Sequence, residues 1–316
     1  MILVTGAFGF IGGHVVRALI DAGETVVAAR HRNGDVPDFL AREVGRGLFV
    51  ETVDIKSAVS IGDVVAKHGV DSVLHMAAPP LGALSAGEEF NLNMQGLGNV
   101  LEVASGADMR RVSLASSVAV YGGMGEGPFR EDQPLRMVAT SSTEAYKKAE
   151  EVLGQFVGGQ TSLDVICLRI GNIYGPGYRS LVNAPSRMVH AAAQGVPGPL
   201  ERQGAPEPYA DDGADFCYVR DCARGLQLLH MSNDLKHKVY NVGSGRMSRF
   251  GEFAAAVEAA RPGSTIRIAP GRGPAHVENA VMDIGRARAD VGYAPRYGPR
   301  EGVADYLEWL QAGHER

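Results

Sequence analysis

Three glycines near the start of the chain have the spacing of a phosphate-binding turn. They follow a short apolar segment, residues 1–4, and open an amphipathic stretch, as a turn between a strand and a helix does. In such a turn the glycines permit the sharp bend, let the backbone approach a pyrophosphate, and let the helix pack on the strand. The anion meets free backbone N–H groups and the positive end of the helix dipole. Residues 1–13 therefore predict a dinucleotide site, and a glycine turn without a ligand is the less favoured alternative. The predicted cofactor contacts there are Gly6, Gly9, Phe10, Ile11 and Gly12.

Arginines stand where the second strand of such a site usually ends in a carboxylate. An NAD-selective site offers an acidic residue there to the ribose hydroxyls, whereas this chain has Arg30, followed closely by Arg32. Guanidinium groups can pair with a 2′-phosphate, although two arginines at the start of a loop can equally be solvated. The sequence therefore favours NADP over NAD as the cofactor.

Strands and helices that would position this turn alternate through the first half of the chain. Amphipathic stretches at residues 12–22 and 91–105 separate short apolar runs that are typical of buried parallel strands. Because connections between parallel strands are right-handed, this alternation predicts a Rossmann-like doubly wound α/β sheet. The predicted strands are residues 2–4, 25–28, 48–53, 72–75, 111–115 and 163–169.

The second half of the chain predicts a smaller C-terminal substrate lobe. Residues 175–213 are rich in Gly and Pro and carry one expected helix, at 186–194. Apolar runs at 216–219 and 239–242 flank a predicted helix at 222–231, so we expect this part to return strands to the first sheet. A closing amphipathic helix at 300–312 should pack on the small lobe. We therefore expect a dinucleotide-binding domain at 1–172, joined by 215–245, and a substrate lobe made of 173–214 and 246–316.

Composition excludes several classes of function. A formal net charge of −5 and the absence of a long Lys/Arg run argue against a nucleic-acid partner. No apolar run is long enough for a membrane span, and no export signal precedes the first strand. Cys167, Cys217 and Cys222 form no disulfide framework, which fits a reducing cytoplasm. The nine histidines are scattered, so we expect no metal site, and His75 is interpreted as a packing residue at a strand end.

Several motifs, in order along the chain, resemble the extended short-chain dehydrogenase/reductase family, in its NAD-dependent epimerase/dehydratase group. The resemblance spans nearly the whole chain and implies a hydride-transferring enzyme that acts on sugar nucleotides or related carbonyl compounds. The matching segments after the glycine turn are 54–55, 75–78, 93–101, 116–122, 168–177, 215–221 and 240–245.

Site residues follow from this resemblance at the matching positions. It implies that Ser117 hydrogen-bonds the substrate oxygen and that Ser116 assists, although a serine pair at a strand end can also cap a turn. It implies a substrate contact at Asn172. The cofactor contacts that it implies are Asp54, Ile55, Ala77, Ala78, Asn93 and Ile170.

The catalytic helix departs from the family's YxxxK pattern. Lys147 followed by Glu151 matches the end of the pattern, which puts Thr143 where the tyrosine should be. A threonine hydroxyl is a poor base near neutral pH. The family's phenol has its pKa lowered by the positive charges of the cofactor ring and the lysine, and a threonine hydroxyl cannot imitate this. Tyr146 lies three residues further along the helix, so a displaced catalytic phenol and a packing aromatic both stay open. Lys147 should still hold the nicotinamide ribose.

Another departure concerns the substrate. Many members carry an arginine for the nucleotide diphosphate where this chain has Ala214, so a diphosphate would lose a bidentate partner at this position. The sequence predicts an NAD(P)-dependent oxidoreductase, epimerase or dehydratase acting on a hydroxyl or carbonyl carbon of a sugar, sugar nucleotide or related small molecule. The alternatives are elimination or isomerisation without net redox, and a catalytically silent cofactor-binding protein. Relatives often dimerise through the helices that match 91–105 and 143–156, so we expect a homodimer.

Overall fold

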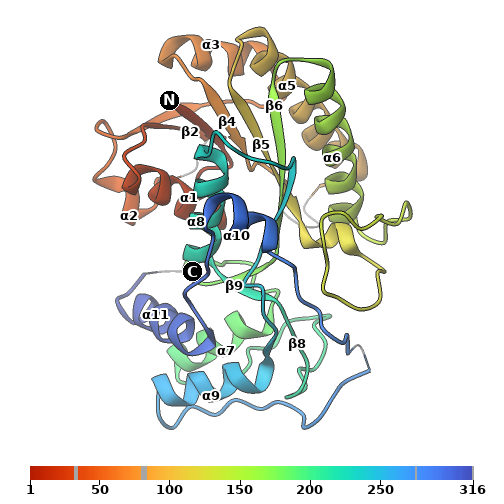
Figure 1. Ribbon diagram of the computed structural model, residues 1–316. Coiled ribbons are helices and arrows are strands. Elements are labelled where there is room, and N and C mark those ends of the chain that lie inside the picture. The colour runs from red at the N-terminus through yellow and green to blue at the C-terminus, as the bar shows by residue number, and fades with distance from the viewer. Residues whose placement is uncertain (32–34, 80–83, 275, 315–316) are drawn as a thin grey trace.

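The computed structural model describes residues 1–31, 35–79, 84–274 and 276–314. A seven-stranded sheet forms its upper part and a smaller lobe lies below the sheet (Figure 1). All strand pairs in the sheet are parallel, in the order β10-β6-β5-β4-β1-β2-β3. The order reverses between β1 and β4, and in open α/β sheets a ligand binds in the crevice outside the strand ends at such a reversal. The strands are β1 (Ile2–Thr5), β2 (Val26–Arg30), β3 (Leu48–Thr52), β4 (Ser72–His75), β5 (Arg111–Ser117), β6 (Asp164–Ile170) and β10 (Val239–Val242).

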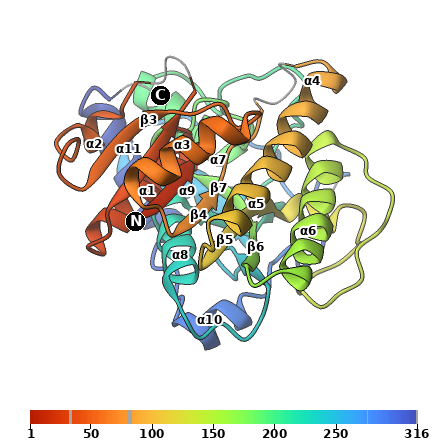
Figure 2. The same cartoon turned by 90° about the horizontal axis from the view of Figure 1, so that it is seen from above.

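Helices cover both faces of the sheet, as Figure 2 shows from above. On one face α1 packs along α8, and on the other α3, α5 and α6 lie in a row. Continuous apolar runs form the strands because both faces are buried, as in β1 and β4, where every residue is buried. The predicted doubly wound parallel sheet is confirmed. The helices of this part are α1 (Phe10–Asp21), α2 (Asp38–Ala41), α3 (Ala58–His68), α4 (Ala86–Phe90), α5 (Gly96–Gly106), α6 (Ser142–Gln160), α8 (Val219–Met231) and α10 (Gly285–Val291), with a π-helical turn, η1 (Asn91–Gln95), and a 3-10 turn, η2 (Val118–Tyr121).

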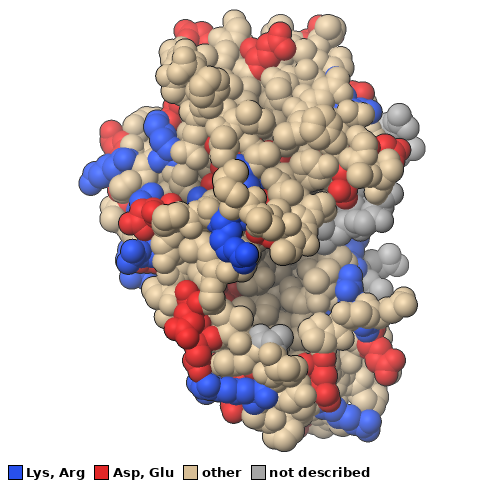
Figure 3. All heavy atoms as spheres, turned by 90° about the vertical axis from the view of Figure 1, so that its right-hand side faces the viewer, with Lys and Arg blue, Asp and Glu red and all other residues tan. Residues whose placement is uncertain are grey.

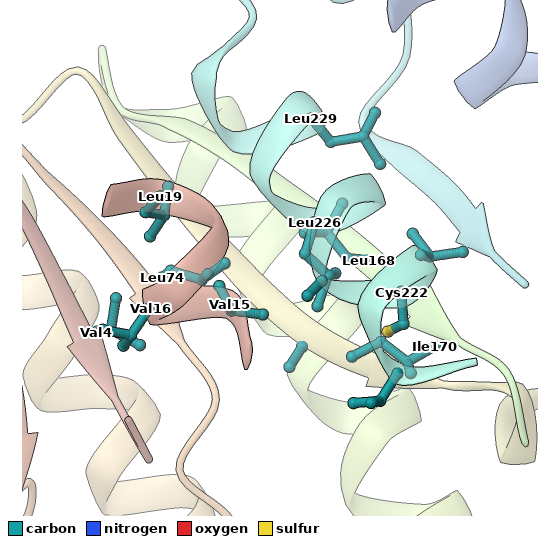
Figure 4. Close-up of a cluster of buried hydrophobic side chains, with 14 of the residues drawn as sticks. Val4, Val15, Val16, Leu19, Leu74, Leu168, Ile170, Cys222, Leu226 and Leu229 are labelled. Carbon is teal, nitrogen blue, oxygen red and sulfur yellow. The ribbon is translucent and has the colours of Figure 1, made fainter. Parts of the chain in front are cut away.

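The core between the sheet and the α1/α8 layer is drawn in Figure 4. Val15, Val16 and Leu19 of α1 meet Leu226 and Leu229 of α8 over the strands, and all are fully buried. Their spacing of three and four residues places them on one face of each helix. This packing fixes the start of α1, and with it the glycine turn, at the lower end of the sheet.

The lower lobe has its own core, in which aromatic rings of two short strands meet three helices. Tyr174, Phe216 and Phe253 pack edge to face, with ring centroids 5.1–5.4 Å apart. The closing helix packs on its two neighbours in this lobe, as predicted. The elements are β7 (Asn172–Tyr174), α7 (Ala184–Gln194), β8 (Gly213–Ala214), β9 (Phe216–Tyr218), β11 (Ser248–Arg249), α9 (Phe250–Ala260) and α11 (Pro299–Gln311).

Two segments depart from the expected division of the chain. β10 returns to the main sheet as predicted, but β9 pairs with β7 in a two-stranded sheet of the lower lobe. The reason is that Phe216 and Tyr218 bury their rings among the lobe's helices. Residues 284–293, expected in the substrate lobe, pack instead on the upper part, because Ile284, Ala287 and Tyr293 belong to the core beside α8. None of the helices in the described ranges is both long and apolar enough to cross a membrane.

Candidate active site

The glycine turn is built by close backbone contacts. Gly6 has a φ of +68°, a conformation that favours glycine, and a Cβ on it would lie 2.8 Å from the backbone of Met76 and Ala77 after β4. A Cβ on Gly12 would overlap the carbonyl oxygen of Gly6. The first turn of α1 has no side-chain cap and no acidic residue, so its N–H groups face outward with a positive dipole end. The turn therefore has the geometry and charge that bind a pyrophosphate.

A cavity of about 710 Å³ opens at this turn, at the lower ends of β1, β2 and β4. Its volume is within the range of small-molecule and cofactor sites. Seven of the predicted cofactor residues line it together, namely Gly6, Gly9, Arg30, Asp54, Ile55, Ala77 and Ala78. Phe10, Ile11 and Gly12 form the adjoining first turn of α1. The residues of the lining that sequence reasoning missed are Thr5, Phe8, Ala29, His31, Val53, Lys56, Met76, Leu84, Glu88, Asn91 and Leu92.

Most of the missed residues are chain neighbours of predicted ones, so extending each motif by one position would have found them. Leu84, Glu88 and Asn91 are different, because they come before the matching segment 93–101, next to α4, within it and at the start of the turn η1. Asn93 lies in that π-helical turn, buried, with its amide donating to the carbonyl of Glu89 at 2.8 Å. Single π-helical turns often occur at functional sites.

The end of β2 presents positive charge to the cavity. Arg30 lines it, and the guanidinium Nε is buried with no hydrogen-bond partner among the described residues. His31 and Lys56 also line the cavity. The Asp54 carboxylate accepts the backbone N–H of Lys56 at 3.0 Å, which ties it to its own turn. Arg32 lies outside the described residues.

His75 ends β4 beneath the cavity and is held by Thr5. The Thr5 hydroxyl oxygen accepts from the backbone N–H groups of Met76 and Ala77 at 3.1 and 3.2 Å, so its own hydrogen is donated to His75 Nδ1 at 2.8 Å. This assigns the imidazole proton to Nε2. Burial, with a further contribution from the Lys147 charge, lowers the pKa of His75 to about 3. His75 is therefore a neutral packing residue, in keeping with its interpretation from sequence.

The two serines at the end of β5 have different surroundings. The Ser117 oxygen accepts the backbone N–H of Ala119 at 3.1 Å and caps η2, and no acceptor for its own hydroxyl hydrogen is found among the described residues. Ser116 is buried, and its hydroxyl donates to the Glu151 carboxylate at 2.5 Å. Glu151 in turn forms a buried ion pair with Arg169 at 2.7 Å. The side chain of Ser116 is thus engaged in the wall behind the site.

Helix α6 approaches the sheet closely at its glycines. A Cβ on Gly154 would overlap the side chain of Leu114 in β5. The helix begins at Ser141, whose side chain accepts the Glu144 N–H, and this places Thr143 in the first turn, half-buried. The Tyr146 hydroxyl lies 3.4 Å from the carbonyl oxygen of Ala86 in α4. The Lys147 ammonium donates to Glu150 at 2.7 Å.

The remaining predicted residues lie at the junction of the two parts. Ile170 ends β6 and is buried, and Asn172 begins β7 with its amide 3.4 Å from the carbonyl of Asp215. The face in Figure 3 is hollowed between the upper and lower parts. Across the described ranges, no group of three His, Cys, Asp or Glu residues has the geometry of a metal site.

Several known proteins are similar to this chain in sequence, and solved structures are similar to it in fold. The chain is 26% identical to UDP-glucose 4-epimerase 2 of Arabidopsis thaliana over 98% of its length and 94% of that protein. It is 28% identical to dTDP-glucose 4,6-dehydratase of Streptomyces niveus over 98% and 92%. The solved structure of MoeE5 in complex with UDP-glucose and NAD is 29% identical, with a TM-score of 0.79 and 99% of each chain covered.

Residues 2–243 match the sequence profile of the NAD dependent epimerase/dehydratase family. This match covers the glycine turn, the strand-end serines and the altered catalytic helix. The family resemblance inferred from the motifs is confirmed. The chain belongs to the NAD dependent epimerase/dehydratase family and is an NAD(P)-dependent enzyme of the extended short-chain dehydrogenase/reductase type.

Proposed function

We propose that this enzyme uses NADP and acts on a hydroxyl or carbonyl carbon of a sugar, sugar nucleotide or related small molecule. The observation that carries the cofactor assignment is Arg30, a cavity-lining guanidinium whose Nε is buried without a hydrogen-bond partner among the described residues. A buried donor without a partner costs about 1–3 kcal/mol, which a 2′-phosphate would recover. His31 and Lys56 line the same cavity and add to the attraction. Arg32 stays a predicted contact.

The test is a comparison of cofactor affinities. Tryptophan or NAD(P)H fluorescence gives the Kd for NADPH and NADH in the wild type and in Arg30→Asp. We expect the wild type to favour NADPH by about tenfold or more, since each charge-assisted hydrogen bond is worth about 1.5–3 kcal/mol. Arg30→Asp should reverse the preference, because a carboxylate repels the phosphate and accepts from ribose hydroxyls. Arg42→Asp, on the exposed end of α2, makes the same charge change away from the cavity and should leave the ratio unchanged. Equal affinity for both cofactors in the wild type would refute the assignment.

The residues present fit a dinucleotide at this place. The turn at Gly6, Gly9 and Gly12 would hold the pyrophosphate, and Asp54, Ile55, Ala77 and Ala78 would line the adenosine half. When bound, the nicotinamide ring supplies hydride acceptance and donation. We propose that Ser117 donates its hydroxyl hydrogen to the reacting substrate oxygen. Lys147 and Asn93 would stand behind the ribose, with Ile170 and Asn172 at the strand end below.

We propose that the substrate carries an anionic group, and the observation that favours this is Arg187 in the lower lobe. Ala214 supplies no charge for a diphosphate, but Arg187 of α7 is buried and, among described residues, has no carboxylate within ion-pair distance. Its Nη1 donates to the Leu200 carbonyl at 3.0 Å, and its Nε has no hydrogen-bond partner in the part of the chain that the structure describes. The relatives named above act on or bind nucleotide sugars. UDP-glucose and glucose are therefore the first pair of substrates to compare.

A second candidate is chemistry without net redox, or silent cofactor binding. The observation that favours it is Thr143 in the place of the family's phenol. NADPH titration followed by hydride transfer to a panel of ketones separates the candidates. Cofactor binding without turnover, and no difference between the wild type and Tyr146→Phe, would favour this second function.

We also propose a homodimer that pairs α5 and α6 of two copies. Val152, Leu153 and Phe156 of α6 are exposed apolar residues three and four positions apart, so they form one stripe. Figure 3 views the molecule from the side of α6 and shows few charged residues over its upper part. We propose a cytoplasmic location, since all three cysteines are buried as free thiols.

A further inference from the structure

A buried ion pair on α6 stands where the family's catalytic lysine is matched. The Lys147 ammonium and the Glu150 carboxylate lie 2.7 Å apart, and their side chains are only 12% and 4% exposed. One helical turn after Glu150, α6 packs closely on the sheet at Gly154, where a Cβ would overlap the Leu114 side chain of β5. Burying both charges of an ion pair costs desolvation free energy. Glu150 therefore does not add stability simply by being buried, which points to a functional role for it.

The groups that face the pair come from three elements. His75 of β4 interacts electrostatically with the Lys147 charge. Cys167 of β6 interacts electrostatically with both Lys147 and Glu150. Glu151, next in the helix, repels Glu150 but is itself bound by Arg169. Burial raises the pKa of Glu150, the Lys147 ammonium opposes that rise, and Glu151 adds to it. The Lys147 ammonium therefore favours the charged form of Glu150.

The other hydroxyl groups of this helix are poorly suited to proton transfer. Thr143 has no titratable proton near neutral pH. The Tyr146 hydroxyl is directed to the carbonyl of Ala86 on α4. The second lysine, Lys148, is bound by Glu144 at 2.7 Å and by the carbonyl of Arg136, in the loop before the helix. Lys147, by contrast, is a proton-bearing group of α6 whose charge acts on His75, the residue before Met76 and Ala77 of the cavity lining.

We propose that Lys147 is the proton donor to the substrate oxygen and that Glu150 is its positioning residue, replacing the missing phenol. In the reducing direction a hydride from the reduced nicotinamide adds to the carbonyl carbon, and the carbonyl π pair moves onto oxygen. That oxygen forms an O–H bond as one N–H bond of the Lys147 ammonium breaks. The neutral amine stays hydrogen-bonded to Glu150 and regains its proton from water. This rests on the proposed function, since it needs a bound cofactor and a carbonyl substrate.

Arginine separates charge from proton donation, because it keeps the positive charge but does not release a proton. Lys147→Arg should keep the Kd for NADPH within about threefold while lowering kcat about 100-fold or more on a panel of ketones that includes keto-sugars. Lys148→Arg is the matched control, and it should leave both values unchanged. Tyr146→Phe should change kcat less than about threefold.

Glu150→Gln tests the positioning role without turnover. The rate at which an acylating reagent labels Lys147, followed by mass spectrometry against pH, reports the pKa of its amine. Because the carboxylate favours the ammonium, Glu150→Gln should move this profile to lower pH and speed labelling at pH 8 about tenfold. The kcat profile should shift in the same direction. Labelling of Lys148 in the same samples should stay unchanged.

Several results would overturn the inference. Full activity in Lys147→Arg, loss of activity in Tyr146→Phe, or an unmoved labelling profile in Glu150→Gln would each do so. A wild type that binds NADPH but reduces none of the ketones would overturn the donor role and favour the second candidate function. A wild type that binds neither NADPH nor NADH would instead refute the proposed function itself.

Discussion

The Gly12 Cα faces the carbonyl oxygen of Gly6 so closely that a Cβ on Gly12 would overlap it. This contact sets the distance between the first turn of α1 and the end of β1. Because Gly6 also lies against the backbone after β4, three elements meet at one point with no side chain between them. The dinucleotide site therefore depends on the absence of a Cβ at both Gly6 and Gly12.

Gly12→Ala should disrupt this junction. The added methyl must push α1 away from β1, which for an overpacked core position costs about 1–3 kcal/mol of unfolding free energy. NADPH affinity should fall at least tenfold, as measured by fluorescence titration. Gly98→Ala in α5 is the matched control, because a Cβ there meets nothing within 4 Å. The control should keep its affinity and gain up to about 1 kcal/mol of stability from helix propensity.

The glycine turn was predictable because its residues act locally. Glycine spacing, a preceding apolar run and a following amphipathic run all lie within residues 1–22, and β1 and α1 confirm them. The roles of the two serines of β5 were less accessible. Adjacent residues of a strand point to opposite faces, but only the tertiary structure shows that Glu151 and Arg169 lie behind Ser116.

A pH dependence of stability should follow from buried His230. Burial, and then the charges of Arg110 and Arg111, lower the pKa of His230 to about 3. In the unfolded chain His230 binds a proton below about pH 6.5, whereas in the folded chain it stays neutral until the pH approaches 3. The folded state is therefore fully stable above about pH 6.5, and its free energy of unfolding falls as the pH falls toward 3. Between pH 6.5 and pH 5, His230 alone should lower the free energy of unfolding by about 1–2 kcal/mol. Urea denaturation at both pH values in the wild type and His230→Gln measures it. A fall that is equally steep in both would count against this origin.

The strand at 216–218 shows why the division of the chain was harder to predict. Its apolar pattern is that of a buried strand, and the structure confirms a strand. Pattern cannot say which sheet receives it, since Phe216 and Tyr218 would be buried in either. The Tyr218 ring packs on Tyr174 and the Phe216 ring on Phe253, contacts between residues 44 and 37 positions apart in the chain, for which no local signal exists.

The buried pair of Glu151 and Arg169 should be coupled. Arg169→Met leaves the carboxylate buried beside Ser116 without its cation, which should cost about 3–5 kcal/mol of unfolding free energy. Adding Glu151→Gln removes the stranded charge, so the double variant should be more stable than Arg169→Met alone. Chemical denaturation of the four proteins gives the coupling energy. Additive losses would show that the two side chains act independently.

The apolar stripe on α6 predicts the oligomeric state. Phe156 is 65% exposed, and Val152, one helical turn before it, is equally exposed. If two copies bury this stripe against each other, Phe156→Lys places a charge in an apolar interface and should convert a dimer to a monomer. Light scattering at micromolar protein measures the mass directly. Val59→Lys, an equally exposed apolar position on α3, adds the same charge away from α6 and should leave the dimer intact. A wild type that is monomeric at this concentration would refute the stripe as an interface between copies.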